Sequence, residues 1–141
     1  MTKYILALIL FFGISVSAIA SEYPKPTKTS ESTMTLALAN QDLIEANILA
    51  NLGSSVDQVR GDALQLIIDI KNNYPSVDMD YAIFPLMSLL KGDKNENVRI
   101  LSAMALSLFN SDRGHFTIRQ ASKFDSSVRV QKICKVLSLN R

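Results

Sequence analysis

Few residues of this chain have the types and spacing that catalysis or metal binding requires. His115 is the only histidine, and no nucleophile motif accompanies it, although acid–base catalysis needs groups that converge from different segments. Cys134 is the only cysteine, so the chain forms no internal disulfide, and one Cys with one His cannot complete a zinc site. We therefore expect a protein that is not an enzyme and that has no catalytic residues, cofactor or metal.

The run from Asp93 to Asn97 begins like a calcium-binding loop, because oxygen-bearing side chains stand at alternate positions. The pattern then fails: Val98 stands where the loop needs Gly, and Met104 stands where it needs a bidentate Glu. The run predicts an exposed polar turn instead.

Residues 1–20 have the organisation of a secretory signal peptide. Lys3 supplies the positive start, Tyr4 to Val16 is almost wholly apolar, and Ala18 to Ala20 puts small residues where a signal peptidase reads them. The apolar run is shorter than the roughly 20 residues that span a bilayer. We predict cleavage before Ser21 and export to the periplasm or the medium, with no transmembrane segment after cleavage.

The remaining chain divides into a short leader and one domain. Residues 21–33 contain Pro24, Pro26 and many Ser, Thr and Lys residues, a composition typical of a flexible segment. Residues 34–141 are enough for one domain with a core of its own. Nothing in them shows the alternation that a strand needs.

A dipeptide Val-Arg occurs three times in this domain, at Val59-Arg60, Val98-Arg99 and Val128-Arg129. Each opens a stretch with the spacing of one helical face. The three stripes are Ala63, Leu64, Ile67 and Ile70; Ser102, Ala103, Leu106 and Phe109; and Lys132, Ile133, Val136 and Leu139. The charged member of the third stripe suits a terminal repeat, whose outer side faces water.

Caps and breakers predict six helices, over residues 34–52, 56–73, 80–91, 98–110, 116–124 and 127–139. Gly53 ends the first, a capping box of Ser55 and Gln58 begins the second, and Pro85 delays the regular part of the third to about Ile83. Ser126 or Asp125 is expected to cap the sixth helix. Because the interval between the second and third Val-Arg dipeptides is shorter than the first, we expect a shortened fifth helix. The fold class is all-α: a short right-handed α-solenoid of about three antiparallel helix pairs.

The segment from Pro85 to Leu90, a polar turn, and Asn97-Val98-Arg99 followed by Ala103 resemble a HEAT repeat. The stretches after Val59 and Val128 are similar to the second helices of two more, so the resemblance implies a HEAT-like domain over residues 34–141. The resemblance implies that an Asp of the turn partners the Arg of the second helix.

Asp57 and Asp125 lie near the place of that turn residue, whereas the middle copy has Asp93 further back and Asn95 closer, which leaves the partner of Arg99 open. An Arg near a helix start presents a fixed fork of donors to loop carbonyls or a carboxylate. We therefore assign Arg60, Arg99 and Arg129 to contacts between repeats.

Charge is divided unevenly along the chain. Residues 21–112 contain seven Lys or Arg and twelve Asp or Glu, whereas residues 113–141 contain seven and one. The cations that form a candidate patch for an anionic partner are Arg113, Arg119, Lys123, Lys132, Lys135 and Arg141. They either keep a terminal repeat soluble, or receive an acidic protein or an anionic envelope surface, or mediate head-to-tail association.

The sequence thus favours an exported, non-enzymatic scaffold module that binds a protein. One alternative is electrostatic binding of anionic polymers or membranes through the basic C-terminal repeat. Another, implied only by the HEAT-like resemblance, is a lyase accessory. Nucleic acid is disfavoured, because aromatic residues are few and no basic stripe crosses several repeats.

Overall fold

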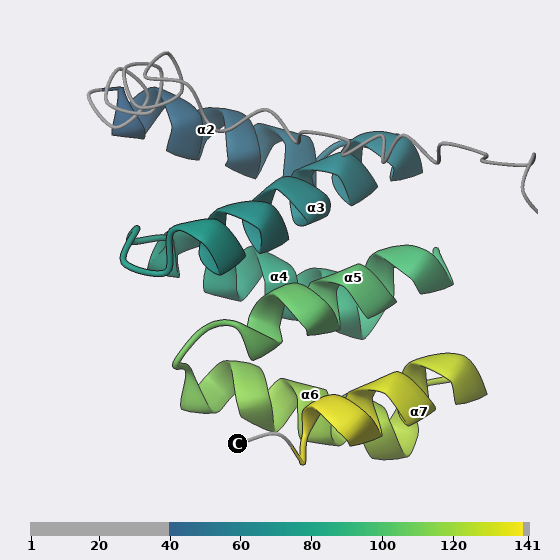
Figure 1. The fold of residues 1–141 in the computed structure, drawn as a ribbon. Coiled ribbons are helices and arrows are strands. Elements are labelled where there is room, and N and C mark those ends of the chain that lie inside the picture. The colour runs from purple at the N-terminus through teal and green to yellow at the C-terminus, as the bar shows by residue number, and fades with distance from the viewer. Residues whose placement is uncertain (1–39, 140–141) are drawn as a thin grey trace, which may run out of the picture. The chain divides into compact units, whose positions relative to one another are not determined.

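The computed structural model describes residues 40–139, and over this range the chain is all-α, as predicted (Figure 1). The elements are α2 (Gln41–Leu52), α3 (Asp57–Asn73), a 3-10 turn η1 (Asp80–Ala82), α4 (Ile83–Gly92), α5 (Glu96–Ser107), α6 (Asp112–Phe124) and α7 (Val128–Leu137). The expected signal peptide, the leader and the start of the first expected helix lie outside the described residues. Within residues 40–139, no helix has the length and apolar character that a membrane crossing would need.

Helices that follow one another in sequence pack together as α2 with α3, α4 with α5, and α6 with α7. We call these the first, second and third helix pairs. The pairs also touch each other in order, because α5 contacts both α3 and α7, and α4 contacts both α2 and α6 (Figure 1). The second pair therefore has a neighbour on each side.

The first helix pair agrees with expectation except at two points. Leu43, an apolar residue of the first predicted helix, is 63% exposed. The predicted capping box is also wrong: the N-cap of α3 is Val56, whose amide donates to Ser54 Oγ at 3.2 Å. Gly53 ends α2 as predicted.

The proline in α4 lies where a helix tolerates it. Regular α-helix begins at Ile83, as predicted, so Pro85 falls in the first turn, where its missing N–H has no intrahelical partner to lose. The preceding 3-10 turn starts where the amide of Asp80 donates to Asp78 Oδ1 at 3.0 Å.

Two helix starts lie earlier than predicted, because Asn and Ser side chains cap them. Asn95 accepts from the Asn97 amide, and α5 therefore begins at Glu96. Ser111 accepts from the amide of Gly114, so α6 begins at Asp112 and has 13 residues. The expectation of a trimmed fifth helix was wrong. The interval between the first two Val-Arg dipeptides is longer because α3 has 17 residues and a long connection follows it.

A side chain would not fit easily at Gly114. A Cβ added there would lie 3.2 Å from Leu106 Cδ2, so the absent side chain lets α6 approach α5 closely. Because α6 begins at Asp112, His115 is a first-turn residue of that helix.

The third Val-Arg dipeptide does not mark the register of α7. The N-cap of α7 is Ser127, whose side chain accepts from the amides of Arg129 and Val130. The predicted caps, Ser126 and Asp125, were wrong. Val136 and Leu139, expected to be buried, are 59% and 74% exposed. The buried face consists instead of Val130 and Cys134, with Ile133 and Leu137 partly buried against the core.

The core runs through all three pairs and is densest around α5. That helix buries Val98, Arg99, Ile100, Ser102, Ala103, Ala105 and Leu106. Fully buried partners come from every other α-helix except α2, among them Leu64, Leu86, Ile118 and Val130. The small residues of α5 fit its position between two neighbouring pairs.

Two matched substitutions test the register of α7. Val130 is 0% exposed and Val128 is 63% exposed. We expect Val130→Ala to lower the free energy of unfolding by about 1 to 3 kcal/mol, because a buried methyl pair is lost. The same change at Val128 should alter it by less than about 0.5 kcal/mol. Urea unfolding followed by circular dichroism measures both, and a larger loss at Val128 would contradict the register.

Candidate functional site

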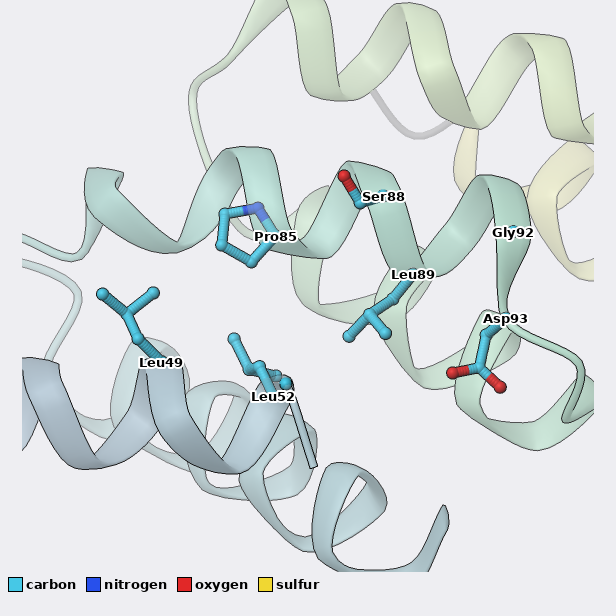
Figure 2. A pocket seen from close by; sticks show the side chains of 8 residues that line it. Leu49, Leu52, Pro85, Ser88, Leu89, Gly92 and Asp93 are labelled. Atoms are coloured by element: carbon cyan, nitrogen blue, oxygen red, sulfur yellow. The ribbon is translucent and has the colours of Figure 1, made fainter. Parts of the chain in front are cut away.

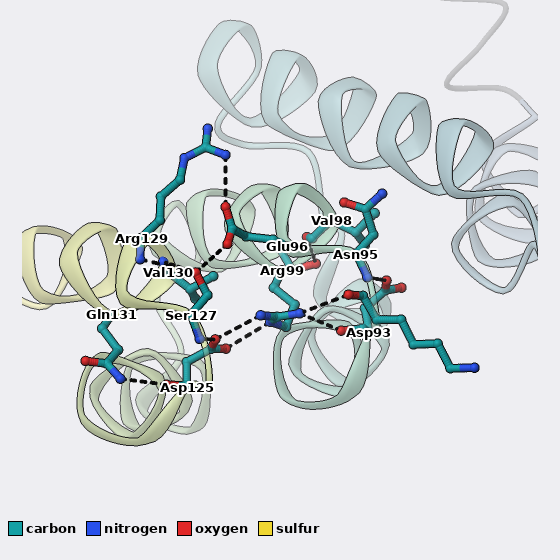
Figure 3. A network of polar contacts seen from close by, with 12 residues as sticks. Asp93, Asn95, Glu96, Val98, Arg99, Asp125, Ser127, Arg129, Val130 and Gln131 are labelled. Atoms are coloured by element: carbon teal, nitrogen blue, oxygen red, sulfur yellow. Dashed lines mark hydrogen bonds and ion pairs between the residues drawn. The ribbon is translucent and has the colours of Figure 1, made fainter.

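Arg99 links the second and third helix pairs through a nearly buried, bidentate ion pair (Figure 3). Its Nε donates to Asp125 Oδ2 at 2.9 Å and its Nη2 donates to Oδ1 at 2.9 Å. Nη1 donates to the carbonyls of Asp93 and Lys94, at 2.9 and 3.3 Å. The side chains of Arg99 and Asp125 are only 9% and 6% exposed. The partner that the sequence left open is therefore the Asp of the following turn.

Arg60 repeats this arrangement between the first and second pairs. Its Nη2 donates to Asp93 Oδ1 at 3.1 Å, and its Nη1 donates to the Ser54 carbonyl at 2.7 Å. Nε lies 2.7 Å from Asp93 Oδ2 as an ion pair but without the angle of a hydrogen bond. Asp57, three residues before Arg60, accepts from Nη2 at 2.6 Å. Two arginines thus reach forward to two turn aspartates, Asp93 and Asp125.

A second row of contacts runs parallel to the first. The acidic residue at the first position of one helix accepts from the N-cap side chain of the next equivalent helix. Asn95 Nδ2 donates to Asp57 Oδ2 at 2.7 Å, and the Ser127 hydroxyl donates to Glu96 Oε2. We call the two rows together the polar ladder: Arg60–Asp93, Arg99–Asp125, Asp57–Asn95 and Glu96–Ser127.

The ladder defines which residues of the pairs are equivalent. The N-caps of α3, α5 and α7 are Val56, Asn95 and Ser127, 39 and 32 residues apart. Four residues after each cap stand Arg60, Arg99 and Gln131. Gln131 Nε2 donates to the Asp125 carbonyl at 2.6 Å, just as Arg99 donates to that of Asp93. The third helix pair therefore carries a glutamine in the place of the arginine.

Arg129 contacts the second pair from a more exposed position. Its Nη1 donates to Glu96 Oε1 at 3.1 Å and to Asn97 Oδ1 at 2.9 Å. Its side chain is 61% exposed, and that of Glu96 is 39% exposed. Exposed pairs of this kind contribute little to stability. Arg129 thus joins two pairs, as expected, but it is not the counterpart of Arg60 and Arg99.

The run that resembles the start of a calcium loop is used by the ladder. Both Asp93 carboxylate oxygens face Arg60, and Oδ1 also accepts from the Asn95 amide at 2.8 Å. Asn95 Oδ1 accepts from the Asn97 amide at 2.9 Å. Among residues 40–139, no group of three His, Cys, Asp or Glu side chains is placed to hold a metal ion.

The ladder shifts the pKa values of its members in the direction that stabilises charge. The hydrogen bond from Asn95, followed by that from Arg60, lowers the pKa of Asp57 below its ordinary 3.8. The hydrogen bond from Ser127, followed by that from Arg129, lowers the pKa of Glu96 below 4.5. The carboxylate of Asp125 raises the pKa of Arg99. These groups remain ionised at neutral pH.

The single thiol, that of Cys134, is buried and unreactive. Cys134 is 0% exposed, and burial raises its pKa to about 11. A neutral, covered thiol is a poor nucleophile and cannot reach another molecule. The cysteine therefore acts as a small core residue of α7.

Two equivalent grooves lie between successive first helices of the pairs. The larger, of about 530 Å³, lies between α2 and α4, with Leu49 and Leu52 facing Pro85 and Leu89 (Figure 2). The smaller, of about 190 Å³, lies between α4 and α6. Their second walls are Pro85, Ser88, Leu89, Gly92 and Asp93 in one, and Thr117, Gln120, Ala121, Phe124 and Asp125 in the other. Each wall residue has its counterpart 32 positions on, which supports the same register as the ladder.

The face formed by α3, α5 and α7 changes in character from helix to helix. On α3 an exposed stripe is polar: Gln58, Asp62, Gln65 and Asp69. The equivalent stripe on α5 consists of Asn97, Leu101, Met104 and Leu108, and that on α7 of Arg129, Ile133 and Val136. A groove of about 300 Å³ between α3 and α5 joins the polar stripe to Leu101. We call these three stripes the recognition face.

The predicted basic patch is only partly gathered. Arg119 and Lys123 are exposed one turn apart on α6, and Lys132 and Lys135 are exposed on α7. Arg113 lies apart from them, with its guanidinium 5.6 Å from the centre of the Phe84 ring on α4. Arg141 lies outside the described residues.

The sequence analysis missed two residues of the ladder, Glu96 and Ser127, and also Gln131, which stands in the place of the arginine in the third helix pair. Glu96, Ser127 and Gln131 have no signal by themselves. An alignment of the chain on the turn aspartates, Asp93 and Asp125, would have found Ser127 and Gln131, because its 32-residue offset places them opposite Asn95 and Arg99.

No family model matches this chain, and no curated protein or solved structure gives a significant match.

Breaking the buried ion pair should cost much more than breaking the exposed one. We expect Asp125→Asn to lower the free energy of unfolding by roughly 2 to 5 kcal/mol, because Arg99 keeps a buried charge without its counterion. Arg129→Gln, which breaks the exposed pair, should cost less than about 1 kcal/mol. Chemical denaturation of both variants at pH 7 measures the difference, and equal losses would show that burial does not govern the ladder.

The lowered pKa values of Asp57 and Glu96 predict acid sensitivity. Since the folded state holds protons on these groups less tightly than the unfolded state does, protonation favours unfolding. Their contribution is present above the ordinary values of 3.8 and 4.5 and is lost as pH falls through the lower, folded values.

We expect the double variant Asp57→Asn with Glu96→Gln to lose less stability than the wild type between pH 5 and the acid limit, on a ~1-unit pH grid of denaturation curves. Parallel curves for the two proteins would contradict the assignment.

Proposed function

We propose that this chain is an exported, non-enzymatic binding module whose three helix pairs form a short right-handed α-solenoid of the HEAT-repeat type. In this proposal the pairs are antiparallel, the signal peptide of residues 1–20 is removed, and the recognition face binds a segment of a protein partner. The single observation that carries the function is the exposed apolar stripe of α5 and α7, bordered by the polar stripe of α3.

The order of contacts supports the solenoid. Each helix pair touches the next, and the first helices and the second helices each contact their own counterparts. The polar ladder repeats the same bonds from pair to pair, and the grooves repeat with the same 32-residue offset. Repetition of one set of contacts between neighbours is the property that distinguishes a repeat array from a closed bundle.

The composition of the recognition face supports a protein partner. Met104, Leu108 and Val136 are 40%, 37% and 59% exposed, and the partly buried Leu101 and Ile133 continue the same stripes. An apolar patch bordered by polar groups is the usual arrangement of a protein interface. Asp62 and Asp69 on α3 add negative charge at one edge, which favours a partner segment with apolar side chains followed by Lys or Arg.

The places of the candidate chemical groups support binding without catalysis. The ladder holds Asp93, Asn95 and Asp125, and the core encloses Cys134. Each of these groups already has a structural role, so we assign none of them to a reaction.

Site-specific photocrosslinking tests the proposed face. A photoreactive amino acid placed at Met104 or at Val136 should give a discrete protein adduct in the cell. The matched control is the same amino acid at Asp42, which is exposed on α2 and lies off the recognition face. Met104→Glu should reduce the yield of the adduct formed at Val136 by about tenfold, because it places a charge in the apolar stripe.

Circular dichroism should show these variants folded, since the substituted side chains are exposed. Adducts of equal yield from all three positions, or none from the recognition face, would refute the proposed interface.

A further inference from the structure

The outer side of the third helix pair carries a second surface, separate from the recognition face. On α5, Glu96, Ile100, Ala103 and Ser107 share one stripe, and Glu96 reaches Ser127 and Arg129 of the third pair. That stripe therefore faces α7. The equivalent residues are Val128, Lys132 and Lys135, which lie along one side of α7, and Leu139, two residues after the end of α7; all four are exposed. We call this stripe, with Arg119 and Lys123 of α6, the terminal face.

The terminal face replaces apolar residues with cations. Lys132 and Lys135 stand where α5 has Ile100 and Ala103, which are 6% and 0% exposed. Arg119 stands where α4 has Met87, a partly buried residue that packs against the core. Three positions that the second pair uses for contact are therefore cationic in the third pair, whereas Lys123 corresponds to Lys91, which is also exposed.

Solubility alone does not explain the sign of these replacements, because a soluble surface usually mixes both charges. After Asp112, the only acidic residue as far as Leu139 is Asp125, and Arg99 already pairs with it. The terminal face thus has four cations and no acidic residue of its own. Its charge is complementary to a surface that is densely anionic.

Large apolar side chains lie among these cations. Val128 begins α7 at 63% exposure, Leu139 follows the end of α7 at 74% exposure, and Phe116 precedes Arg119 on α6 at 55% exposure. Lysines interspersed with exposed apolar side chains are typical of surfaces that rest on a bilayer, where the cations meet headgroups and the apolar groups enter the acyl boundary. An acidic polypeptide would need the cations but not these apolar groups.

We propose that the terminal face docks the protein on a bilayer that contains anionic phospholipid. Lys132, Lys135, Arg119 and Lys123 contact the headgroups, and Val128 and Leu139 enter the interface between headgroups and acyl chains. The recognition face lies on a different side of α7 and stays accessible to its partner.

Vesicle co-sedimentation of the processed chain, residues 21–141, tests this proposal, because the apolar run of residues 4–16 would bind vesicles by itself. The probes are vesicles of phosphatidylcholine alone and vesicles in which about a third of the lipid is phosphatidylglycerol, a fraction chosen to give a strong negative surface potential. We expect binding to the anionic vesicles that weakens with salt. Lys132→Glu with Lys135→Glu should lower it by at least about tenfold, because two positive charges at the contact become negative.

The matched control is Lys91→Glu with Lys94→Glu, which makes the same change in net charge at exposed positions off the terminal face. It should bind within about twofold of the wild type. Val128→Asn with Leu139→Asn should weaken vesicle binding several-fold while leaving binding to soluble polyglutamate unchanged.

Three results would overturn the proposal. The first is equal loss in the two lysine pairs, which would show an effect of net charge alone. The second is vesicle binding that is unchanged by the Val128 and Leu139 substitutions, together with polyglutamate binding that requires Lys132 and Lys135. That result would assign the face to an acidic polypeptide. The third is salt-dependent self-association that the same lysines control without any vesicle binding, which would assign it to a second copy. Met104→Glu should leave vesicle binding intact, so failure here is distinct from failure of the proposed recognition face.

Discussion

The ion pair between Arg99 and Asp125 is the contact on which the arrangement of the last two helix pairs depends. Both side chains are nearly buried, so loss of either one would leave the other's charge without a counterion and with little access to water. The bidentate geometry fixes distance and angle together, whereas apolar contacts between helices tolerate sliding. The remaining guanidinium nitrogen holds the carbonyls of the Asp93 turn. One arginine therefore orients its own turn and the next helix pair at once.

The need to pair polar side chains between helix pairs also explains why the described residues offer few candidate catalytic or metal-binding groups. In the sequence, the acidic and amide side chains of the turns resemble metal ligands or catalytic groups. In the structure, Asp57 and Asp93 accept hydrogen bonds from Arg60, and Asn95 donates one to Asp57. At α7 the pattern changes, since Gln131 and Val128 stand where α5 has Arg99 and Glu96. The last pair thus receives ladder contacts from α5 without offering the matching forward groups. Its outer stripe is free to carry Lys132 and Lys135.

Much of the helical fold was predictable, because local signals decide it: Gly53 ends α2, and Pro85 sets the start of regular helix at Ile83. The register of α7 was not predictable from the Val-Arg dipeptide. In α3 and α5 the Arg of that dipeptide stands four residues after the N-cap, whereas Arg129 stands two residues after Ser127. The partner of Arg99 was likewise undetermined, since the ion pair spans 26 residues and depends on the packing of α6. Of the predicted basic patch, the structure separates Arg113, because its contact with Phe84 turns it toward α4.

Amide hydrogen exchange of wild type and Asp125→Asn, followed by mass spectrometry, tests most directly whether the buried pair docks the third helix pair on the second. If it does, the substitution raises exchange in α6 and α7 while α3 and α4 keep most of their protection, since ladder contacts of the first two pairs remain. Uniform loss of protection across residues 40–139, or unchanged protection in α6 and α7, would contradict an arrangement held by successive contacts between pairs.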